Sequence, residues 1–478
     1  MTTTRISTGV AVLISCAGCL GPYRFHSTRT DAGDGASVDG SADADVVLDA
    51  PSVDAPSCSS PITKLRAFEG ATCAQRANGD VYCWGSNVPP DGTSMGLGAI
   101  RRIAARADDF IVGGYARSPF VCVLAGDAVQ CAGGNAQGQL GLPPDTRTPA
   151  LAPLLTVGGV TGVRAMSAGL GHVCVLRSDT PTSARQVVCW GFPTSNRTGR
   201  IPTGLGPPTT VWGEPTVLDT MGVTTPATFE SIHSAGTTNM VVARLASGRE
   251  LFGWGAADFS TFPIVGGGAG TVTPNNDLDF APFQAEFGKL LVSSRLVCGV
   301  KSTQPSLYCL GITASGVFGS GVNMPTNMWT SLASPSPIAM GDDGALAAVG
   351  SLEAEDSGTN PSGFACAVFT NQPSVVSCIG SNRFGQLGTF SGVQSSTWEP
   401  VETPSRGTAG DGTNIRQLVA GAAHACVLTT RNEVYCWGRD VCGERGPEFI
   451  GSSDKCQTLA PERPARQLPN RIDVPCPR

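Results

Sequence analysis

The sequence repeats one short pattern many times. All copies but one have an apolar segment that contains a cysteine, then a turn, then a second apolar segment that ends in cysteine, an aromatic or aliphatic residue, and glycine. The copy at 424–438 shows it in full, with Cys426 and Cys436 on its two arms. Apolar alternation on both sides of a turn predicts a β-hairpin. A hairpin that recurs at intervals of about 50 to 70 residues is typical of β-propeller blades with variable loops.

The pattern can be aligned seven times along the chain. The copies lie at 72–85, 121–133, 172–191, 240–255, 297–311, 365–380 and 424–438. The composition agrees with this pattern. The 478 residues include 61 glycines and 35 prolines, and only 15% are charged, which favours short strands and turns over long helices. We therefore predict an all-β fold, a seven-bladed β-propeller over residues 58–478.

Six of the seven copies carry two cysteines, one on each arm of the hairpin. Zinc sites favour cysteines only a few residues apart, whereas directly opposite residues of antiparallel strands place their Cβ atoms near disulfide distance. The fourth copy lacks both cysteines, with Val241 and Gly253 in their places, and loss of both together is what a bond predicts. The predicted hairpin disulfides are Cys73–Cys83, Cys122–Cys131, Cys174–Cys189, Cys298–Cys309, Cys366–Cys378 and Cys426–Cys436.

Four further cysteines lie outside the hairpins and outside the N-terminal segment. We predict a local loop disulfide, Cys442–Cys456, and a disulfide between the two ends of the domain, Cys58–Cys476. Each hairpin disulfide closes a short loop, which removes roughly 3 kcal/mol of entropy from the unfolded chain in the simple loop model. These pairings leave no cysteine for a metal or for catalysis, so we expect no metal and no cofactor.

The N-terminus predicts export. Arg5 precedes a short apolar stretch at 9–14, which is too short to span a bilayer and is typical of a signal peptide over residues 1–15. The residues Leu13-Ile14-Ser15-Cys16 resemble a bacterial lipobox, so Cys16 is the predicted lipidation site. Cys19 is the alternative site, and a cleaved signal without lipid, which would release the protein, also stays open.

The segment 16–57 is predicted to be the lipid-anchor site followed by a disordered linker. It contains seven Asp residues and, from Thr28 to Ala55, no aromatic residue and no Lys, so it cannot bury enough apolar surface to fold. The net charge of −6 comes mostly from this linker. The remainder is close to neutral and has no basic cluster, which argues against nucleic-acid binding.

The hairpin copies resemble a known repeat. The segment from His424 to Leu428, followed by Val434-Tyr435-Cys436-Trp437-Gly438, is similar to the repeat of the regulator of chromosome condensation family. The closing Gly-Gln-Leu-Gly of that repeat is matched at 138–141 and 385–388, while 316–319 and 443–446 depart from it. The resemblance covers roughly residues 62–450 and implies a seven-bladed propeller. Trp84, Trp190, Trp254 and Trp437 recur at one repeat position and are expected to pack between blades.

Three stretches are longer than a blade requires, and they are rich in Pro, Gly, Thr and Ser: 192–230, 256–290 and 312–362. Loops on a rigid scaffold often carry binding function. The candidate binding residues are the large aromatic residues of these stretches: Phe192, Trp212, Phe259, Phe262, Phe283 and Trp329.

No catalytic motif stands out, and the chain has only four His. Members of the resembled family act as a nucleotide exchange factor, a plant ultraviolet-B photoreceptor and a secreted β-lactamase inhibitor. Export excludes the first role, and the Trp cluster of the second is missing. We predict a non-enzymatic, lipid-anchored protein-binding scaffold, monomeric, on the outer membrane of a Gram-negative cell. The alternatives are a structural envelope component and a carbohydrate-active or other hydrolytic enzyme, whose acids would be Glu250, Asp258, Asp277 and Asp279.

Overall fold

The computed structural model divides the chain into two compact units, Met1–Ser57 and Cys58–Arg478. The structure describes residues 59–85, 100–115, 118–143, 154–178, 186–192, 213–217, 228–236, 238–245, 248–255, 273–274, 287–293, 296–301, 306–313, 324–332, 335–352, 362–389, 394–401, 414–440 and 469–476. The predicted signal peptide, lipidation site and linker lie outside these residues. Every element within them is a β-strand.

Seven antiparallel sheets of four strands each form the second unit. The first three are β1 (Ile62–Phe68), β2 (Ala71–Arg76), β3 (Val81–Gly85) and β4 (Arg101–Ala104); β5 (Asp109–Tyr115), β6 (Ser118–Ala125), β7 (Ala128–Gly133) and β8 (Leu155–Thr156); and β9 (Val163–Ala168), β10 (His172–Arg177), β11 (Gln186–Gly191) and β12 (Gly213–Val217). The fourth is β13 (Thr228–Ala235), β14 (Thr238–Leu245), β15 (Gly248–Gly255) and β16 (Thr273–Pro274).

The last three are β17 (Phe287–Val292), β18 (Leu296–Lys301), β19 (Leu307–Thr313) and β20 (Met324–Leu332); β23 (Ala347–Leu352), β24 (Ser362–Phe369), β25 (Gln372–Ser381) and β26 (Gln394–Pro400); and β27 (Ile415–Ala420), β28 (His424–Thr429), β29 (Val434–Gly438) and β30 (Asn470–Ile472). A small two-stranded hairpin, β21 (Met340–Gly341) and β22 (Gly344–Ala345), is inserted between two of them.

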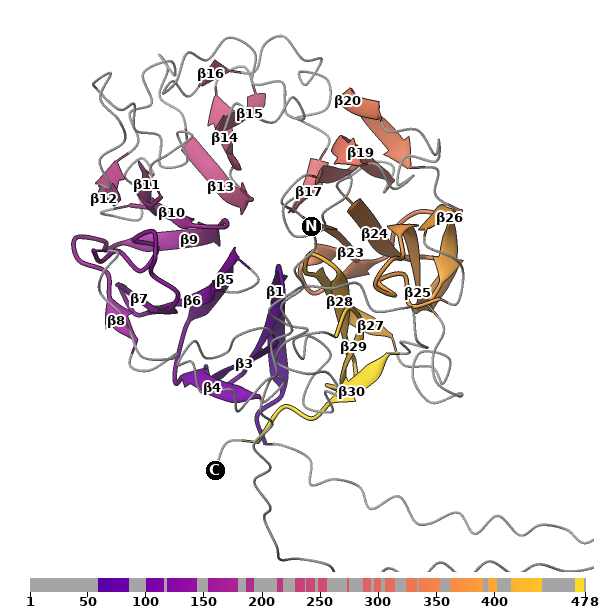
Figure 1. Cartoon of the computed structure of the whole chain (residues 1–478), viewed down its shortest axis with the longest axis horizontal. Helices are drawn as coiled ribbons and strands as arrows, with labels where there is room; N and C mark the ends of the chain where they lie inside the picture. Colours follow the sequence, from indigo (N-terminus) through magenta and orange to yellow (C-terminus); the bar gives the residue numbers. More distant parts are fainter. Residues whose placement is uncertain are drawn as a thin grey trace, which may run out of the picture. The chain divides into compact units, whose positions relative to one another are not determined.

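The sheets are arranged in a ring with the first strand of each sheet innermost (Figure 1). Each innermost strand contacts the innermost strand of the next sheet, and β27 contacts β1, so the ring is closed. The prediction of an all-β propeller is confirmed. Each of the seven hairpin copies supplies the second and third strands of one sheet.

The six predicted hairpin disulfides are present in the structure. In every case the two cysteines are directly opposite in the register, as Cys73 is to Cys83 and Cys426 is to Cys436. Their Cα atoms are 4.0 to 4.2 Å apart, as in the close, non-hydrogen-bonded pairs of an antiparallel ladder. All twelve of these cysteine side chains are fully buried, so the disulfides are part of the protein core.

The fourth sheet shows where one assignment was wrong. The register pairs Met240 with Gly253 and Val241 with Phe252. In the third copy, Cys189 lies two residues before Gly191 and is opposite Cys174. Gly253 likewise lies two residues before Gly255, so it is the equivalent of Cys189. Met240, not Val241, therefore occupies the place of the first cysteine. Without a cysteine to anchor the alignment, the run of apolar residues at 240–242 allowed a shift of one position, which reverses the face of every side chain.

The glycine at or near the end of each third strand is explained by its backbone. Gly133 and Gly438 have φ values of 113° and 101°, which residues with a side chain rarely adopt. A Cβ at either position would lie 2.5 Å from a backbone carbonyl oxygen at the start of the second strand. The repeat therefore requires glycine at this position for both reasons.

The two ends of the ring are joined by hydrogen bonds between sheets, one of them from the backbone N–H of Ala422 to the Glu69 carbonyl, and not by a shared sheet. The Arg76 guanidinium donates hydrogen bonds to the backbone carbonyls of Ser60 (2.5 Å), Val474 (2.6 Å) and Pro475 (2.9 Å). Cys476 is disulfide-bonded. Its predicted partner Cys58 lies outside the described residues, as do Cys442 and Cys456.

The three stretches predicted to be long loops are not loops throughout. The stretch 192–230 contains β12 and the start of β13, and 256–290 contains β16 and the start of β17. The stretch 312–362 contains β20 to β23. Outer and inner strands of the blades were hidden here because they carry none of the cysteine and tryptophan positions that identify the hairpins.

Candidate functional site

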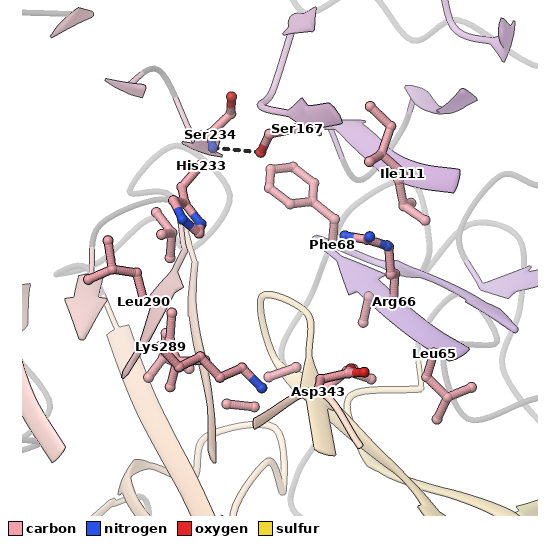
Figure 2. A pocket seen from close by; sticks show the side chains of 18 of the residues that line it. Leu65, Arg66, Phe68, Ile111, Ser167, His233, Ser234, Lys289, Leu290 and Asp343 are labelled. Atoms are coloured by element: carbon pink, nitrogen blue, oxygen red, sulfur yellow. Dashed lines mark hydrogen bonds between the residues drawn. The ribbon is translucent and has the colours of Figure 1, made fainter. Parts of the chain in front are cut away.

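A cavity of about 690 Å³ lies in the centre of the ring (Figure 2). Residues of all seven innermost strands line it, and the turn of the β21–β22 hairpin contributes Asp343. The lining combines apolar side chains with several ionisable ones. The ionisable lining residues are Lys64, Arg66, Glu230, His233, Lys289 and Asp343.

One wall of the cavity carries a cationic pair that shares a single carboxylate. Lys64 Nζ lies 2.8 Å from Asp109 Oδ1, and Arg66 Nη2 lies 3.2 Å from both oxygens of Asp109. Burial disfavours the ionised Asp109, but Arg66 and Lys64 outweigh it and hold the pKa of the carboxyl below its ordinary value. The bridge joins β1 to β5.

The β21–β22 hairpin is tied to two neighbouring sheets. Arg416 of β27 donates to Asp342 with an Nε–Oδ2 distance of 2.8 Å. Gln417 Nε2 donates to Asp343 Oδ2 (2.6 Å), and Gln417 Oε1 accepts the backbone N–H of Leu65 in β1 (2.7 Å). The hairpin, the last sheet and the first sheet are thus connected through one buried glutamine.

Lys289 of β17 reaches towards the same hairpin. Its Nζ donates to the carbonyl of Ala345 at 3.1 Å, and Figure 2 shows the side chain directed towards Asp343. Burial lowers the pKa of Lys289, and the charge of Asp343 opposes this only in part. Within the described residues, no carboxylate forms an ion pair with this lysine.

His233 lies on the wall formed by β13. Its Nε2 is 3.0 Å from Ser231 Oγ, and the next residue, Ser234, donates its backbone N–H to Ser167 Oγ of β9 (2.7 Å). Burial, and then the positive charge of Arg66, lowers the pKa of His233 to about 4. At neutral pH the His233 imidazole is therefore uncharged.

The rim of the ring is built by the Gly-Gln-Leu-Gly element. In 385–388, Gln386 Oε1 accepts the N–H of Phe384, and Asn382 Oδ1 accepts the N–H of Leu387. The Gln386 carbonyl then accepts the indole N–H of Trp437 in the next sheet (3.0 Å). The other full copy makes the same contact, from Trp190 to the Gln139 carbonyl at 3.0 Å.

The recurring tryptophans pack between sheets, as predicted, wherever their side chains are described. Trp84, Trp190 and Trp437 are at most 1% exposed, and Trp84 packs against residues of the last sheet such as Cys426 and Leu428. The Trp254 side chain lies outside the description. His424 also acts between sheets, because its Nε2 is 2.7 Å from Thr72 Oγ1.

Few of the predicted binding and acidic residues can be assessed. Phe192 is half-buried, and its backbone N–H donates to the Gly171 carbonyl (2.9 Å), which places it at the rim and not in the central cavity. Trp329 and Glu250 lie on β20 and β15, but their side chains are not described. The others lie outside the described residues: Trp212, Phe259, Phe262, Phe283, Asp258, Asp277 and Asp279.

Sequence reasoning missed the cavity residues because the hairpin pattern does not include the first strand of each sheet. Lys64 and Lys289 are each opposite the residue two after the first hairpin cysteine, whereas His233 is opposite Met240. Only the closed ring brings these side chains to one cavity. In the described part of the chain, no three His, Cys, Asp or Glu side chains are grouped to hold a metal. Nor does that part contain a helix of the length and apolarity needed to cross a membrane.

Comparison with known proteins supports the repeat assignment. Residues 415–444 match the model of the Regulator of chromosome condensation (RCC1) repeat. The human protein WBSCR16 has a similar structure, with a TM-score of 0.56 and 15% identity over 79% of this chain and 85% of that one.

Prp20p from Saccharomyces cerevisiae gives a TM-score of 0.51 with 14% identity, over 76% of this chain and 80% of that one. A second structure of the yeast protein, bound to Kap60, gives the same TM-score with 15% identity, over 75% and 78%. No curated protein sequence matches. The likeness to these structures shows the propeller fold, and within that fold residues 415–444 carry a repeat that matches the RCC1 repeat.

Proposed function

We propose that this chain is a protein-binding scaffold that presents one face of the propeller to its partner. Strand direction alternates within each sheet, so the first and third strands of all sheets end at the same face. The connections from third to fourth strands leave this face, which we call the long-loop face. They are 86–100, 134–154, 192–212, 256–272, 314–323, 382–393 and 439–469. At the opposite face, second and third strands are joined by much shorter turns, such as 126–127 and 370–371. The connections from fourth to first strands, such as 275–286 and 401–414, also leave that face.

The long connections on one rigid face are the observation that carries the proposal. Binding residues are commonly placed on loops whose ends are fixed by a scaffold. The yeast protein of the same fold, Prp20p, binds Gsp1p and histones, and a crystal structure contains it bound to Kap60. Low identity to that protein makes this a precedent for the use of the fold, not for the partner. We propose a non-enzymatic role and a monomer.

Export to an oxidising compartment is part of the proposal. Six buried disulfides are typical of proteins outside the reducing cytosol. Together with the lipobox, they support a lipoprotein held through Cys16 on the outer membrane, with the propeller beyond an Asp-rich linker. We also propose that the sheet without a disulfide, β13 to β16, is a full blade, which gives seven.

Site-specific photocrosslinking tests which face binds. A crosslinking amino acid at Ala136 or Arg383 samples the long-loop face, and one at Asp127 or Gln372 samples the opposite face of the same two sheets. We expect one recurrent protein adduct in cell-envelope preparations from the first pair only. Equal adducts from both pairs, or none from either, would reject the long-loop face.

The anchor is tested separately. Metabolic labelling with a fatty-acid probe should label the wild-type chain and the Cys19→Ser variant but not the Cys16→Ser variant. If labelling is lost only in the Cys19→Ser variant, Cys19 is the lipidation site. A mature protein without label, recovered in the medium, contradicts the anchor and leaves the scaffold proposal intact.

A further inference from the structure

Lys289 is a half-buried cation without an ionic partner in the described structure. Its ammonium has three donors, of which one is used by the Ala345 carbonyl. Removing an ammonium group from water is costly unless a counter-charge compensates it. Asp343 is nearby but is hydrogen-bonded to Gln417 and forms no ion pair with Lys289. The amine therefore has unused capacity to bind an anion, and it lines the cavity.

The other walls add charged and apolar surface. Lys64 and Arg66 share Asp109, and Glu230 of β13 also lines the cavity. Phe68 of β1 and Leu290 of β17 also line the space, and Figure 2 shows both beside the charged groups. A volume of about 690 Å³ lies within the usual range for small-ligand sites.

We propose that the central cavity binds a small organic carboxylate, with its anionic group on Lys289 and its apolar part against the cavity wall. This goes beyond the proposed protein-binding role, which concerns the long-loop face, and either proposal can fail alone. A purely structural lysine, which only ties β17 to the β21–β22 hairpin, is the competing explanation. It predicts no preference for an anion.

The test is calorimetric titration of the full chain with benzoate and with benzamide. The two probes have nearly the same shape, but only benzoate is charged. We expect benzoate to bind at least ten-fold more tightly, because charge-assisted hydrogen bonds are about twice as strong as neutral ones. Equal affinity, or no binding of benzoate at millimolar concentration, overturns the proposal without any variant.

Variants then assign the site. Lys289→Met should weaken benzoate binding about ten-fold or more, whereas Lys301→Met, which removes a lysine outside the cavity, should leave it unchanged. Lys289→Arg keeps the charge and should bind within a few-fold of wild type. Asp343→Asn removes the competing negative charge and should tighten binding. Unchanged binding in a folded Lys289→Met variant, or weaker binding in Asp343→Asn, contradicts the assignment.

Discussion

Single residues hold neighbouring sheets together in this molecule. At the seam between the last and first sheets, His424 of β28 pairs with Thr72 of β2. Burial, followed by the charge of Arg439, lowers the pKa of His424 from 6.5 to about 3. The folded protein therefore keeps this histidine neutral at pH values at which the unfolded chain protonates it.

Acid should weaken the fold through His424. Because its folded pKa lies below the unfolded value, its contribution is fully present above about pH 6.5 and is lost as the pH falls from there towards 3. Between pH 7.5 and 5.0 this loss should be about 2 kcal/mol. Urea unfolding at both pH values measures it.

The matched comparison is His424→Asn, which retains a hydrogen-bonding group but does not titrate. Its free energy of unfolding should be lower than that of wild type at pH 7.5 and should change less between the two pH values. His233, whose pKa is also lowered, remains in both proteins and cancels in the comparison. Parallel pH dependence in the two proteins contradicts the assignment to His424.

At the scale of the element, the hairpins were predictable and the other strands were not. Cysteine, tryptophan and glycine mark the second and third strands in fixed positions, because the disulfide, the indole contact and the crowded glycine each demand one residue type. The first strand of each sheet has no such demand, so residues like Lys64 and Lys289 of the cavity could not be foreseen. The β21–β22 hairpin was also hidden, since it occurs once and follows no repeat.

The fourth sheet allows the hairpin geometry to be tested by adding a disulfide. Met240→Cys with Gly253→Cys places cysteines in the directly opposite pair and should form a bond without assistance. The closed loop should raise the free energy of unfolding by about 2 to 3 kcal/mol. Thiol titration and urea unfolding measure the two effects.

Val241→Cys with Gly253→Cys is the control for this element. Val241 is opposite Phe252, so it is one position out of register with Gly253. This pair should retain two free thiols. If the Met240→Cys, Gly253→Cys variant kept free thiols while the control formed a disulfide, the register of this sheet would be shifted by one residue.

At the scale of the whole molecule, the ring depends on its seam. Arg76 is only 4% exposed and binds three carbonyls from both ends of the described domain. Arg76→Met should lower the free energy of unfolding by about 2 to 4 kcal/mol, because it leaves buried carbonyls without donors. Hydrogen exchange should accelerate at 469–476 while the central sheets stay protected.

Arg471→Met serves as the comparison for the seam. Arg471 is 52% exposed and forms surface ion pairs with Glu433 and Asp473. Its loss should cost less than about 1 kcal/mol. Similar effects of the two substitutions would mean that Arg76 contributes only as a surface charge.

Closure of the ring without a shared sheet has a consequence for how the gene can be rearranged. Every sheet is built from four consecutive strands, so no sheet needs both termini. Ser60 and Val474 are bound to the same guanidinium, which places the two ends within reach of a short peptide linker. A circularly permuted gene that starts at β5 and ends at β4 would therefore encode the same set of sheets. The blades are modular units whose order around the ring is cyclic, with a starting point that the fold itself does not dictate.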